Sequence, residues 1–320
     1  MDSLHSAAVP RVVVDLGGTN ARVALFDPSG NEYRALRSFT NRDYDSLGDI
    51  LNIWLQALDE PAPTICCIAA AAPPAEDRVD MINIDWSFSC AELARHCGFE
   101  RAAWLNDFQA NACALPHLEP DQQETLRDGE SRSGQALTVM GPGTGLGGAV
   151  LEWVNGQPRA RACEPGHMGL SPGTEEELEI FRRLMPRYGE IDTERLVSGS
   201  GLLLIYQSLA QIHDREAAIQ SPAGVSSAAL AGDELSVMAL DTFCALLGSA
   251  CGDFVLANGA YGGMYLAGGI TPRILQHLRG SDFLQRFSAK GDLSDILQRV
   301  PVYAVTAAQP GLIGAAHAPL

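Results

Sequence analysis

Apolar residues along this chain follow two spacings, and each spacing predicts a different kind of element. Short runs rich in Val, Ile and Ala, such as Arg11–Leu16, predict strands, and the uninterrupted run at 64–72 is typical of a strand buried on both faces. Apolar residues at every third or fourth place over 44–58 predict a helix. The same patterns predict strands at 21–27, 33–40, 102–105, 137–140, 149–153, 263–267 and 301–305, and helices at 89–96, 109–115, 175–185, 201–213, 233–257 and 311–317. This order favours an α/β fold with a central sheet, whereas the polar, aperiodic stretch 119–133 predicts a surface connector.

The first glycine-rich turn lies between two predicted strands near the start of the chain. Asp15 ends the first strand, Gly17, Gly18 and Thr19 follow, and the chain then returns to an apolar strand. Because glycine has no Cβ, the backbone of such a hairpin can approach a phosphate closely, and its N–H groups can surround the phosphate oxygens. At the end of its strand, Asp15 is well placed to act on a cation that accompanies a phosphate.

A second turn of the same design occurs at 141–148, between the strands predicted at 137–140 and 149–153. For either turn alone, an ordinary hairpin is the alternative interpretation, since glycine pairs are common at hairpin tips. Two such turns, each with a threonine at the tip, favour two related domains that face one nucleotide.

Two other nucleotide-binding motifs are excluded by what surrounds these glycines. Residues 143–148 match GxGxxG, but the dinucleotide-binding version of that motif requires a helix immediately afterwards. Here an alternating, β-rich segment follows instead. No GxxxxGK[ST] segment is present, which excludes a P-loop protein.

The charge balance narrows the class of partner. The chain has 22 Lys and Arg against 39 Asp and Glu, a formal net charge of -17, which argues against a nucleic-acid binder because a phosphate backbone requires a basic face.

The eight cysteines of the chain form no CxxC pair and lie mostly in apolar segments, which favours a reducing cytoplasm. The N-terminal sequence lacks the features of a secretory signal, and we expect no bilayer-spanning segment and no membrane partner.

Three polar residues are candidates for chemistry. Asp107 lies between a predicted strand and a predicted helix, where a carboxylate can serve as a general base or, equally, cap the helix N-terminus. Glu164 and His167 lie three residues apart, and Pro165 between them disfavours a helix. The pair could bind a metal, bind a polyol or lie at the surface as ordinary polar residues.

Several short segments together carry a family resemblance. They are residues 15–22 (DLGGTNAR), 83–86 (NIDW), 105–108 (LNDF), 141–147 (GPGTGLG), 164–167 (EPGH), 194–199 (ERLVSG) and 266–270 (LAGGI). In this order they resemble the actin-like ATPase superfamily of sugar kinases and, more narrowly, the zinc-motif-free branch of the bacterial glucokinase family. The resemblance covers nearly the whole chain.

The resemblance implies a two-domain actin-like (ribonuclease H-like) ATPase fold of the α/β class, with a mixed central sheet in each domain and a cleft between them. Residues 1–115 with 306–320 would form the small domain, which carries the first phosphate hairpin and the catalytic Asp. Residues 116–305 would form the large domain, which carries the second phosphate hairpin, the sugar-clamping residues and the adenosine motif. The implied activity is ATP-dependent phosphorylation of glucose at its 6-hydroxyl, in a cytoplasmic homodimer.

The resemblance also implies roles for individual residues, with Asp107 as the general base of phosphoryl transfer. The implied sugar-binding residues are Asn83, Asn106, Asp107, Glu164, His167 and Glu194. The implied ATP-binding residues are Val14, Asp15, Leu16, Gly17, Gly18, Thr19, Asn20, Gly143, Thr144, Gly145, Gly268 and Gly269. Asp15 would hold Mg²⁺ through water.

The sequence departs from related families at three places. Pro73 and Pro74 lie in a loop that more often contains glycine, and Pro165 also replaces a more usual glycine; both changes border the implied sugar site. Many kinases of the repressor–kinase (ROK) group carry a cysteine-rich zinc motif after ExGH. Residues 168–172 contain no cysteine here, so we expect no zinc.

Three alternative functions use the same fold. One is a kinase for another hexose, such as fructose, mannose or an N-acetylhexosamine. Another is a sugar-responsive regulator, which would require an N-terminal helix-turn-helix and a basic surface, whereas only ten residues precede the first predicted strand of this acidic chain. The third is a non-catalytic actin-like filament protein, which would have no use for Asp107 or the polyol-binding residues.

Overall fold

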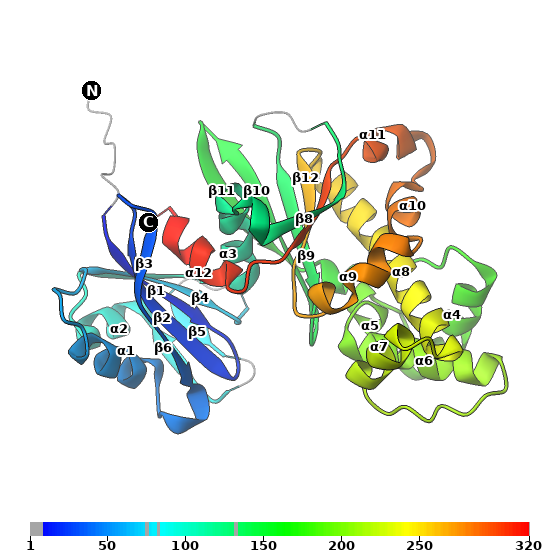
Figure 1. Ribbon diagram of the computed structural model, residues 1–320, viewed down its shortest axis with the longest axis horizontal. Coiled ribbons are helices and arrows are strands. Elements are labelled where there is room, and N and C mark those ends of the chain that lie inside the picture. Colours follow the sequence, from blue (N-terminus) through cyan, green and yellow to red (C-terminus); the bar gives the residue numbers. More distant parts are fainter. Residues whose placement is uncertain (1–8, 74–76, 82–83, 131–133, 320) are drawn as a thin grey trace. The chain divides into compact units, whose positions relative to one another are not determined.

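The computed structural model describes residues 9–73, 77–81, 84–130 and 134–319. The chain divides into two compact units, each built around a mixed sheet (Figure 1). The first unit comprises Met1–Leu118, Pro158–Ala162 and Ala307–Leu320; the second comprises Glu119–Gln157 and Cys163–Thr306. The predicted α/β class, with a mixed sheet in each part of the molecule, is confirmed.

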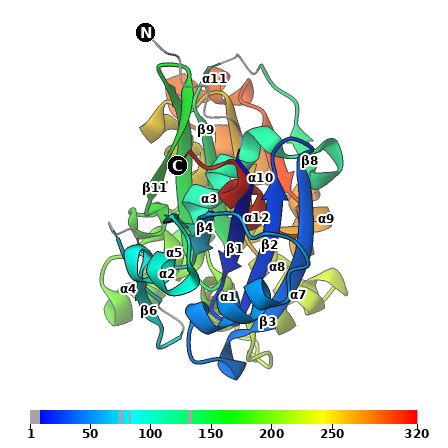
Figure 2. The ribbon, with the colours of Figure 1, turned by 90° about the vertical axis from the view of Figure 1, so that its left-hand side faces the viewer.

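The sheet of the first unit has the order β3-β2-β1-β4-β7. Its strands are β1 (Arg11–Leu16), β2 (Asn20–Asp27), β3 (Glu32–Thr40), β4 (Ile65–Ala70) and β7 (Arg101–Asn106). The strands β1, β2 and β3 form an antiparallel meander and lie side by side in Figure 2, whereas β1, β4 and β7 run parallel. A separate pair, β5 (Arg78–Asp80) and β6 (Ser87–Ser89), is antiparallel.

Helices cover both faces of this sheet. On one face lie α1 (Leu47–Gln56) and α2 (Cys90–Cys97), and on the other α3 (Asp107–Ala114) and α12 (Pro310–His317). Neighbouring side chains of a strand point to opposite faces, so Val12 and Val14 pack with the first pair of helices and Val13 with the second. This double burial explains why β1 and β4 are apolar without alternation.

The sheet of the second unit has the order β11-β10-β9-β12-β13-β8. Its strands are β8 (Gln123–Arg127), β9 (Leu137–Pro142), β10 (Leu146–Val154), β11 (Gln157–Cys163), β12 (Gly263–Leu266) and β13 (Val302–Val305), and of these β11 is the one whose residues 158–162 are assigned to the first unit. Strands β9 and β10 form an antiparallel hairpin, and β12 runs parallel to both β9 and β13. The hairpin is the second glycine-tipped turn predicted from the sequence.

Strand β8 corrects the expectation of a connector over 119–133. Gln123–Arg127 pairs antiparallel with β13 at the edge of the sheet. Its side chains are all exposed or half-buried, so it carries no apolar pattern. Its position depends on main-chain pairing with a strand far along the chain, which no local sequence signal reports.

The second unit is rich in helices that pack on its sheet and on one another. They are α4 (Glu175–Tyr188), α5 (Thr193–Leu196), α6 (Gly199–Ile212), α7 (Pro222–Leu230), α8 (Glu234–Asn258), α9 (Thr271–Gly280), α10 (Phe283–Ser288) and α11 (Ser294–Gln298). Contrary to our expectation, α8 is long and apolar enough to cross a membrane by length and composition. Its apolar stretch is 78% buried inside the protein, and core helices of soluble proteins pass the same test.

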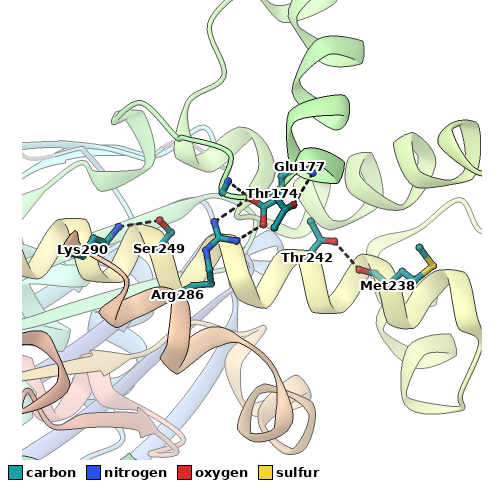
Figure 3. Close-up of polar contacts among 8 residues, drawn as sticks. Thr174, Glu177, Met238, Thr242, Ser249, Arg286 and Lys290 are labelled. Carbon is teal, nitrogen blue, oxygen red and sulfur yellow. Dashed lines mark hydrogen bonds and ion pairs between the residues drawn. The ribbon is translucent and has the colours of Figure 1, made fainter. Parts of the chain in front are cut away.

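A partly buried ion pair joins α4 to α10 (Figure 3). The guanidinium of Arg286 donates from Nη1 to Oε1 of Glu177 at 2.6 Å and from Nη2 to Oε2 at 3.1 Å. The N–H of Gly173 donates to the same Oε2 at 2.5 Å, and a Cβ at Gly173 would collide with the guanidinium. The bidentate pair therefore fastens the loop before α4 to α10, and that loop follows the EPGH segment.

Candidate active site

The carboxyl ends of three parallel strands bring the first set of predicted residues together. Leu16, Ala70 and Asn106 lie in one row across β1, β4 and β7. Gly17 and Asp107 directly follow this row, so the hairpin and the candidate base leave the same edge of the sheet, two strand spacings or about 10 Å apart. Open α/β sheets bind ligands outside this edge.

The first hairpin closes through its own backbone. The N–H of Gly17 donates to the carbonyl of Asn20 at 3.0 Å, and the strand β2 begins at Asn20. Gly18 is half-buried and Thr19 is exposed between them. The tip therefore presents small residues and main-chain groups, as a phosphate-binding turn requires.

Asp15 points to the opposite face of β1 from Val14 and Leu16, which are buried in the core against α1 and α2. Arg22 lies directly across the hairpin and donates from Nη1 to Oδ2 of Asp15 at 3.2 Å. Burial raises the pKa of Asp15, and the attraction of Arg22 opposes that rise. A Cβ at Gly311 would lie 2.8 Å from Oδ1, so the glycine in α12 leaves room for the carboxylate.

These surroundings fit a magnesium ion that arrives with a nucleotide. A nearby cation would offset the cost of holding the charge of Asp15 in a buried place. Mg²⁺ is typically held by one or two carboxylates together with substrate phosphates and waters, which matches a single aspartate beside a phosphate-sized hairpin. Over the described ranges, no group of three or more His, Cys, Asp or Glu side chains could hold a metal by itself.

Asn106, rather than Asp107, caps α3. Its Oδ1 accepts from the N–H of Phe108 at 2.9 Å and of Gln109 at 3.3 Å, while its Nδ2 donates to the carbonyl of Ala72 at 2.9 Å. The side chain of Gln109 returns a hydrogen bond to the N–H of Asn106, which completes a capping box. The interpretation of Asp107 as the N-cap of α3 is therefore wrong, because Asn106 occupies that position.

These hydrogen bonds limit which polar groups of Asn106 and Asp107 can contact a sugar. The two lone pairs of the Asn106 oxygen are both used, so its side chain has one N–H left to donate. Asp107 is the first residue of α3 and is half-buried, and its Oδ1 also accepts a hydrogen bond from the N–H of Phe108 at 3.0 Å. Asn83, also predicted to bind sugar, and Pro74 lie outside the described residues.

The second hairpin is held from outside by α6. The N–H of Gly143 donates to the carbonyl of Gly145 at 2.8 Å, and the carbonyl of Gly143 accepts from the N–H of Gly199 at 2.9 Å. Thr144 is exposed at the tip. A Cβ at Gly143 would meet no atom within 4 Å, so open space adjoins the turn.

The predicted adenosine motif lies against the base of the same hairpin. Gly268 has a φ of +81°, and a Cβ there would lie 2.5 Å from the carbonyl oxygen of Pro142. The N–H of Ile270 donates to that carbonyl at 3.3 Å. Position 268 therefore requires glycine, both for its positive φ and for its close approach to Pro142. A Cβ at Gly269 would meet no atom within 4 Å.

Glu194 connects three segments of the second unit. From α5, its Oε2 accepts the N–H of Leu146 at 2.8 Å, at the end of the second hairpin. A Cβ at Gly145 would lie 2.5 Å from this oxygen, and one at Gly166 would lie 3.2 Å from it. Glycine is required at 166, because a Cβ there would also lie 2.7 Å from the carbonyl oxygen of Leu146, whereas a Cβ at Gly145 would displace the end of the Glu194 side chain.

Glu164 and His167 lie at the surface of the second unit, on either side of a short turn. Pro165–His167 forms a short 3₁₀ helix, although we expected Pro165 to disfavour a helix; proline is tolerated at the first position, where its missing N–H costs nothing. Within the part of the chain that the structure describes, neither side chain has a hydrogen-bond or ion-pair partner. Both are thus available to a ligand.

A short connection ties this turn to the helix that carries Glu194. The N–H and the hydroxyl of Thr193 both donate to the carbonyl of Met168, at 2.8 and 2.9 Å. Thr193 is 3% exposed, and Gly169 forms a bridge with Asp192 just beside it. The structure therefore assembles Glu164, His167 and Glu194 on two segments that are joined by their backbones.

Sequence reasoning missed three residues that shape these sites: Arg22, Gly311 and Thr193. The first could have been found, because a two-residue tip fixes the register of the first hairpin and sets Arg22 opposite Asp15. The other two act on residues distant in sequence, and no local pattern marks them.

Comparison with known proteins identifies the family of the chain. The family model for glucokinase matches residues 12–319. A glucokinase from Chromohalobacter salexigens is 38% identical over 314 residues, which cover 97% of this chain and 97% of that protein. The chain belongs to the glucokinase family. The predicted resemblance is thereby confirmed over nearly its whole length.

Solved structures agree with the glucokinase fold. The structure of a glucokinase from an Antarctic psychrotroph superposes with a TM-score of 0.89 at 35% identity, covering 96% of this chain and 98% of that one. A ROK family glucokinase from Streptomyces griseus, solved in complex with glucose and AMPPNP, gives a TM-score of 0.63 at 18% identity and covers 96% of this chain and 98% of that chain. At that identity the likeness concerns the fold alone, and the predicted actin-like ATPase fold is confirmed.

Proposed function

We propose that this chain transfers the γ-phosphoryl group of ATP to the 6-hydroxyl of glucose, giving glucose 6-phosphate and ADP. The observation that carries the proposal is the match to the glucokinase family over residues 12–319. The geometry supports it, because one sheet edge of the first unit carries both a phosphate-sized hairpin and a carboxylate. The second unit adds a second hairpin and three polar side chains suited to a polyol.

In this mechanism Asp107 accepts the proton of the 6-hydroxyl as its oxygen attacks the γ-phosphorus, and ADP leaves in line with the attack. One N–H of Asn106, together with Glu164, His167 and Glu194, would hold the sugar hydroxyls, and Asn83 would join them. A site that hydrogen-bonds the hydroxyls of its substrate discriminates strongly against sugars that lack one of them.

The backbone of the two hairpins, at 17–20 and 143–145, would donate hydrogen bonds to the phosphates from two sides. Asp15 would hold Mg²⁺ through water, and Gly268 and Gly269 would lie against the adenosine. When bound, Mg²⁺ neutralises charge on the β- and γ-phosphates. Val14, Leu16 and Asn20 would contribute through the main chain that shapes the first hairpin.

The same proposal assigns the catalytic Asp and first hairpin to the small domain, 1–115 with 306–320, and the remaining sites to the large domain, 116–305. Closure of the domains over the sugar would exclude water, which otherwise competes as acceptor. We also propose a cytoplasmic homodimer without zinc. The described cysteines are all free thiols, as in a reducing compartment.

The decisive experiment is a coupled assay of ADP release with glucose, fructose, mannose and N-acetylglucosamine as acceptors. We expect the highest kcat/KM with glucose, and NMR of the product should show the phosphate on the 6-oxygen. A higher kcat/KM with another hexose would show that this hexose, and not glucose, is the preferred acceptor. ADP release that does not depend on any sugar would overturn the kinase proposal.

A further inference from the structure

Asn41 clamps the first glycine hairpin from the end of β3. Its Nδ2 donates to the carbonyl of Gly17 at 2.8 Å, and its backbone N–H donates to the carbonyl of Thr19 at 2.9 Å. Its own carbonyl accepts from the N–H of Tyr44 at 3.0 Å, which fixes the residue in the turn Asn41–Asp43. One asparagine thus bonds to main-chain atoms on both sides of Gly18.

The side chain of Asn41 is only 2% exposed. Because a carbonyl oxygen can only accept, the amide nitrogen must face Gly17, and the orientation of the side chain is fixed. Its Oδ1 is consequently left buried without a hydrogen-bond partner among the described residues. An unpaired buried oxygen is unfavourable, so the clamp is kept at a cost to stability.

The hairpin has little else to hold its shape. Adjacent glycines allow many backbone conformations. Within the tip itself, the structure shows a hydrogen bond from the N–H of Gly17 to the carbonyl of Asn20. The clamped tip also lines a cavity of about 740 Å³ that Arg42 and Trp86 border as well. A small change in the direction of the carbonyl of Gly17 would rotate the N–H of Gly18, which belongs to the same peptide group.

We propose that Asn41 is a positioning residue for ATP: it fixes the peptide planes of the 17–19 turn so that their N–H groups point at the phosphates. The inference rests on the proposed phosphate role of this hairpin. In this role Asn41 holds the turn and does not itself bind the phosphates. It acts by lowering the cost of ordering the turn when the nucleotide binds.

The test compares Asn41→Asp and Asn41→Ala with the unmodified protein. Asp has the same shape but cannot donate to the carbonyl of Gly17, and Ala removes the contact without adding charge. For both variants we expect KM for ATP to rise about tenfold, the scale of one hydrogen bond lost at a buried group. The dissociation constant of glucose, measured without nucleotide, should change less than about twofold, because the sugar site is not involved.

Trp54→Phe is the matched control. The indole Nε1 of Trp54 donates to the carbonyl of Ala35 at 2.8 Å, so this variant also loses one hydrogen bond from a buried side chain to the backbone, but in β3 and away from the hairpin. It should lower the unfolding midpoint without changing KM for ATP. If Trp54→Phe raises KM for ATP as much as the Asn41 variants do, the effect is general destabilisation and the proposal is wrong.

Gly17→Ala separates this inference from the function on which it rests. A Cβ at Gly17 would lie an ordinary 3.5 Å from the carbonyl of Asn20, so the fold accepts it, but a methyl would obstruct an approaching phosphate. If Gly17→Ala leaves KM for ATP unchanged, the phosphate role of the hairpin fails and the Asn41 proposal falls with it. If Gly17→Ala raises KM but both Asn41 variants do not, only the clamp is overturned. If KM for ATP rises in Asn41→Asp but not in Asn41→Ala, the cause is repulsion between the new carboxylate and the phosphates, and the proposed role of Asn41 is also overturned.

Discussion

At the scale of single residues, the neighbours Asn106 and Asp107 have different roles, although both lie at the start of α3. Asn106 uses its amide to cap α3 and to bind the loop carbonyl of Ala72. The cap fixes the start of the helix, and Asp107 follows it by one residue at the edge of the sheet. A rigidly held carboxylate at this place suits a general base, which must be aligned with the hydroxyl it deprotonates.

Asp107→Asn should lower kcat by at least about 100-fold, because the amide keeps the size of the side chain but cannot accept the proton. Glucose should still bind with nearly unchanged affinity. Steady-state kinetics and calorimetric titration with glucose measure the two quantities. Glu92→Gln, which changes an exposed first-turn carboxylate of α2, is the control and should leave both unchanged. Turnover of Asp107→Asn near that of the parent protein would rule out Asp107 as the base.

At the scale of elements, the helix α12 links the end of the chain to its start. Leu312 and Ala315 pack under the sheet with Val13 of β1, and Gly314 allows α12 to cross α3 at a distance that any Cβ would prevent. At the N-terminal end of the helix, Gly311 adjoins Asp15. The position of α12 therefore bears directly on the first hairpin.

The stacked imidazoles of His117 and His317 predict that stability depends on pH. The rings of His117 and His317 lie parallel with centroids 3.6 Å apart, and Phe26 meets His317 edge-on. Burial, followed by the charges of His117 and Arg11, lowers the pKa of His317 from 6.5 to about 4. Burial also lowers the pKa of His117. The folded protein thus resists protonation that the unfolded chain accepts.

Stability should consequently fall as the pH drops from 6.5 towards 4 and be fully present above 6.5, since the unfolded state binds more protons in that range. Urea unfolding at pH about 7.5 and about 5 measures the loss. His317→Phe keeps a ring beside Phe26 but cannot be protonated. It should show a smaller loss between these pH values than the parent protein, and an equal loss would contradict the assignment.

At the scale of the whole molecule, the chain folds into two units that each contain a glycine hairpin between antiparallel strands. The second unit fastens its EPGH segment with protein groups: Thr193 holds the carbonyl of Met168, and the Glu177–Arg286 pair holds the following loop. Many kinases of the ROK group carry a cysteine-rich zinc motif in this region, and residues 168–172 of this chain contain no cysteine. A protein-only fastening predicts that metal is required for chemistry and not for folding.

Dialysis against a chelator should therefore abolish turnover while leaving the unfolding midpoint unchanged, and Mg²⁺ alone should restore turnover. Metal analysis of the purified protein should find zinc well below one equivalent. Adding back Zn²⁺ in place of Mg²⁺ provides the control. Tightly bound, stoichiometric zinc, or unfolding on chelation, would contradict this prediction.

The sequence by itself determined the strands of both large sheets except β8 and β11, most of the helices and both hairpins, because their signals are local. Alternation, helical spacing and a glycine pair at a turn act over a few residues, and they held for 11–16, 47–56 and 141–148 in the structure. The family resemblance rested on the same local segments. It did not require knowledge of which strands are neighbours.

Only the tertiary structure decided which distant groups meet. It paired β8 with β13, set Leu16, Ala70 and Asn106 in one row, and placed Asn41 beneath the first hairpin. It also gave the cap of α3 to Asn106 and thereby distinguished its role from that of Asp107. The physical reason is that strand register and side-chain hydrogen bonds depend on through-space distances, which the local pattern of apolar and polar residues does not contain.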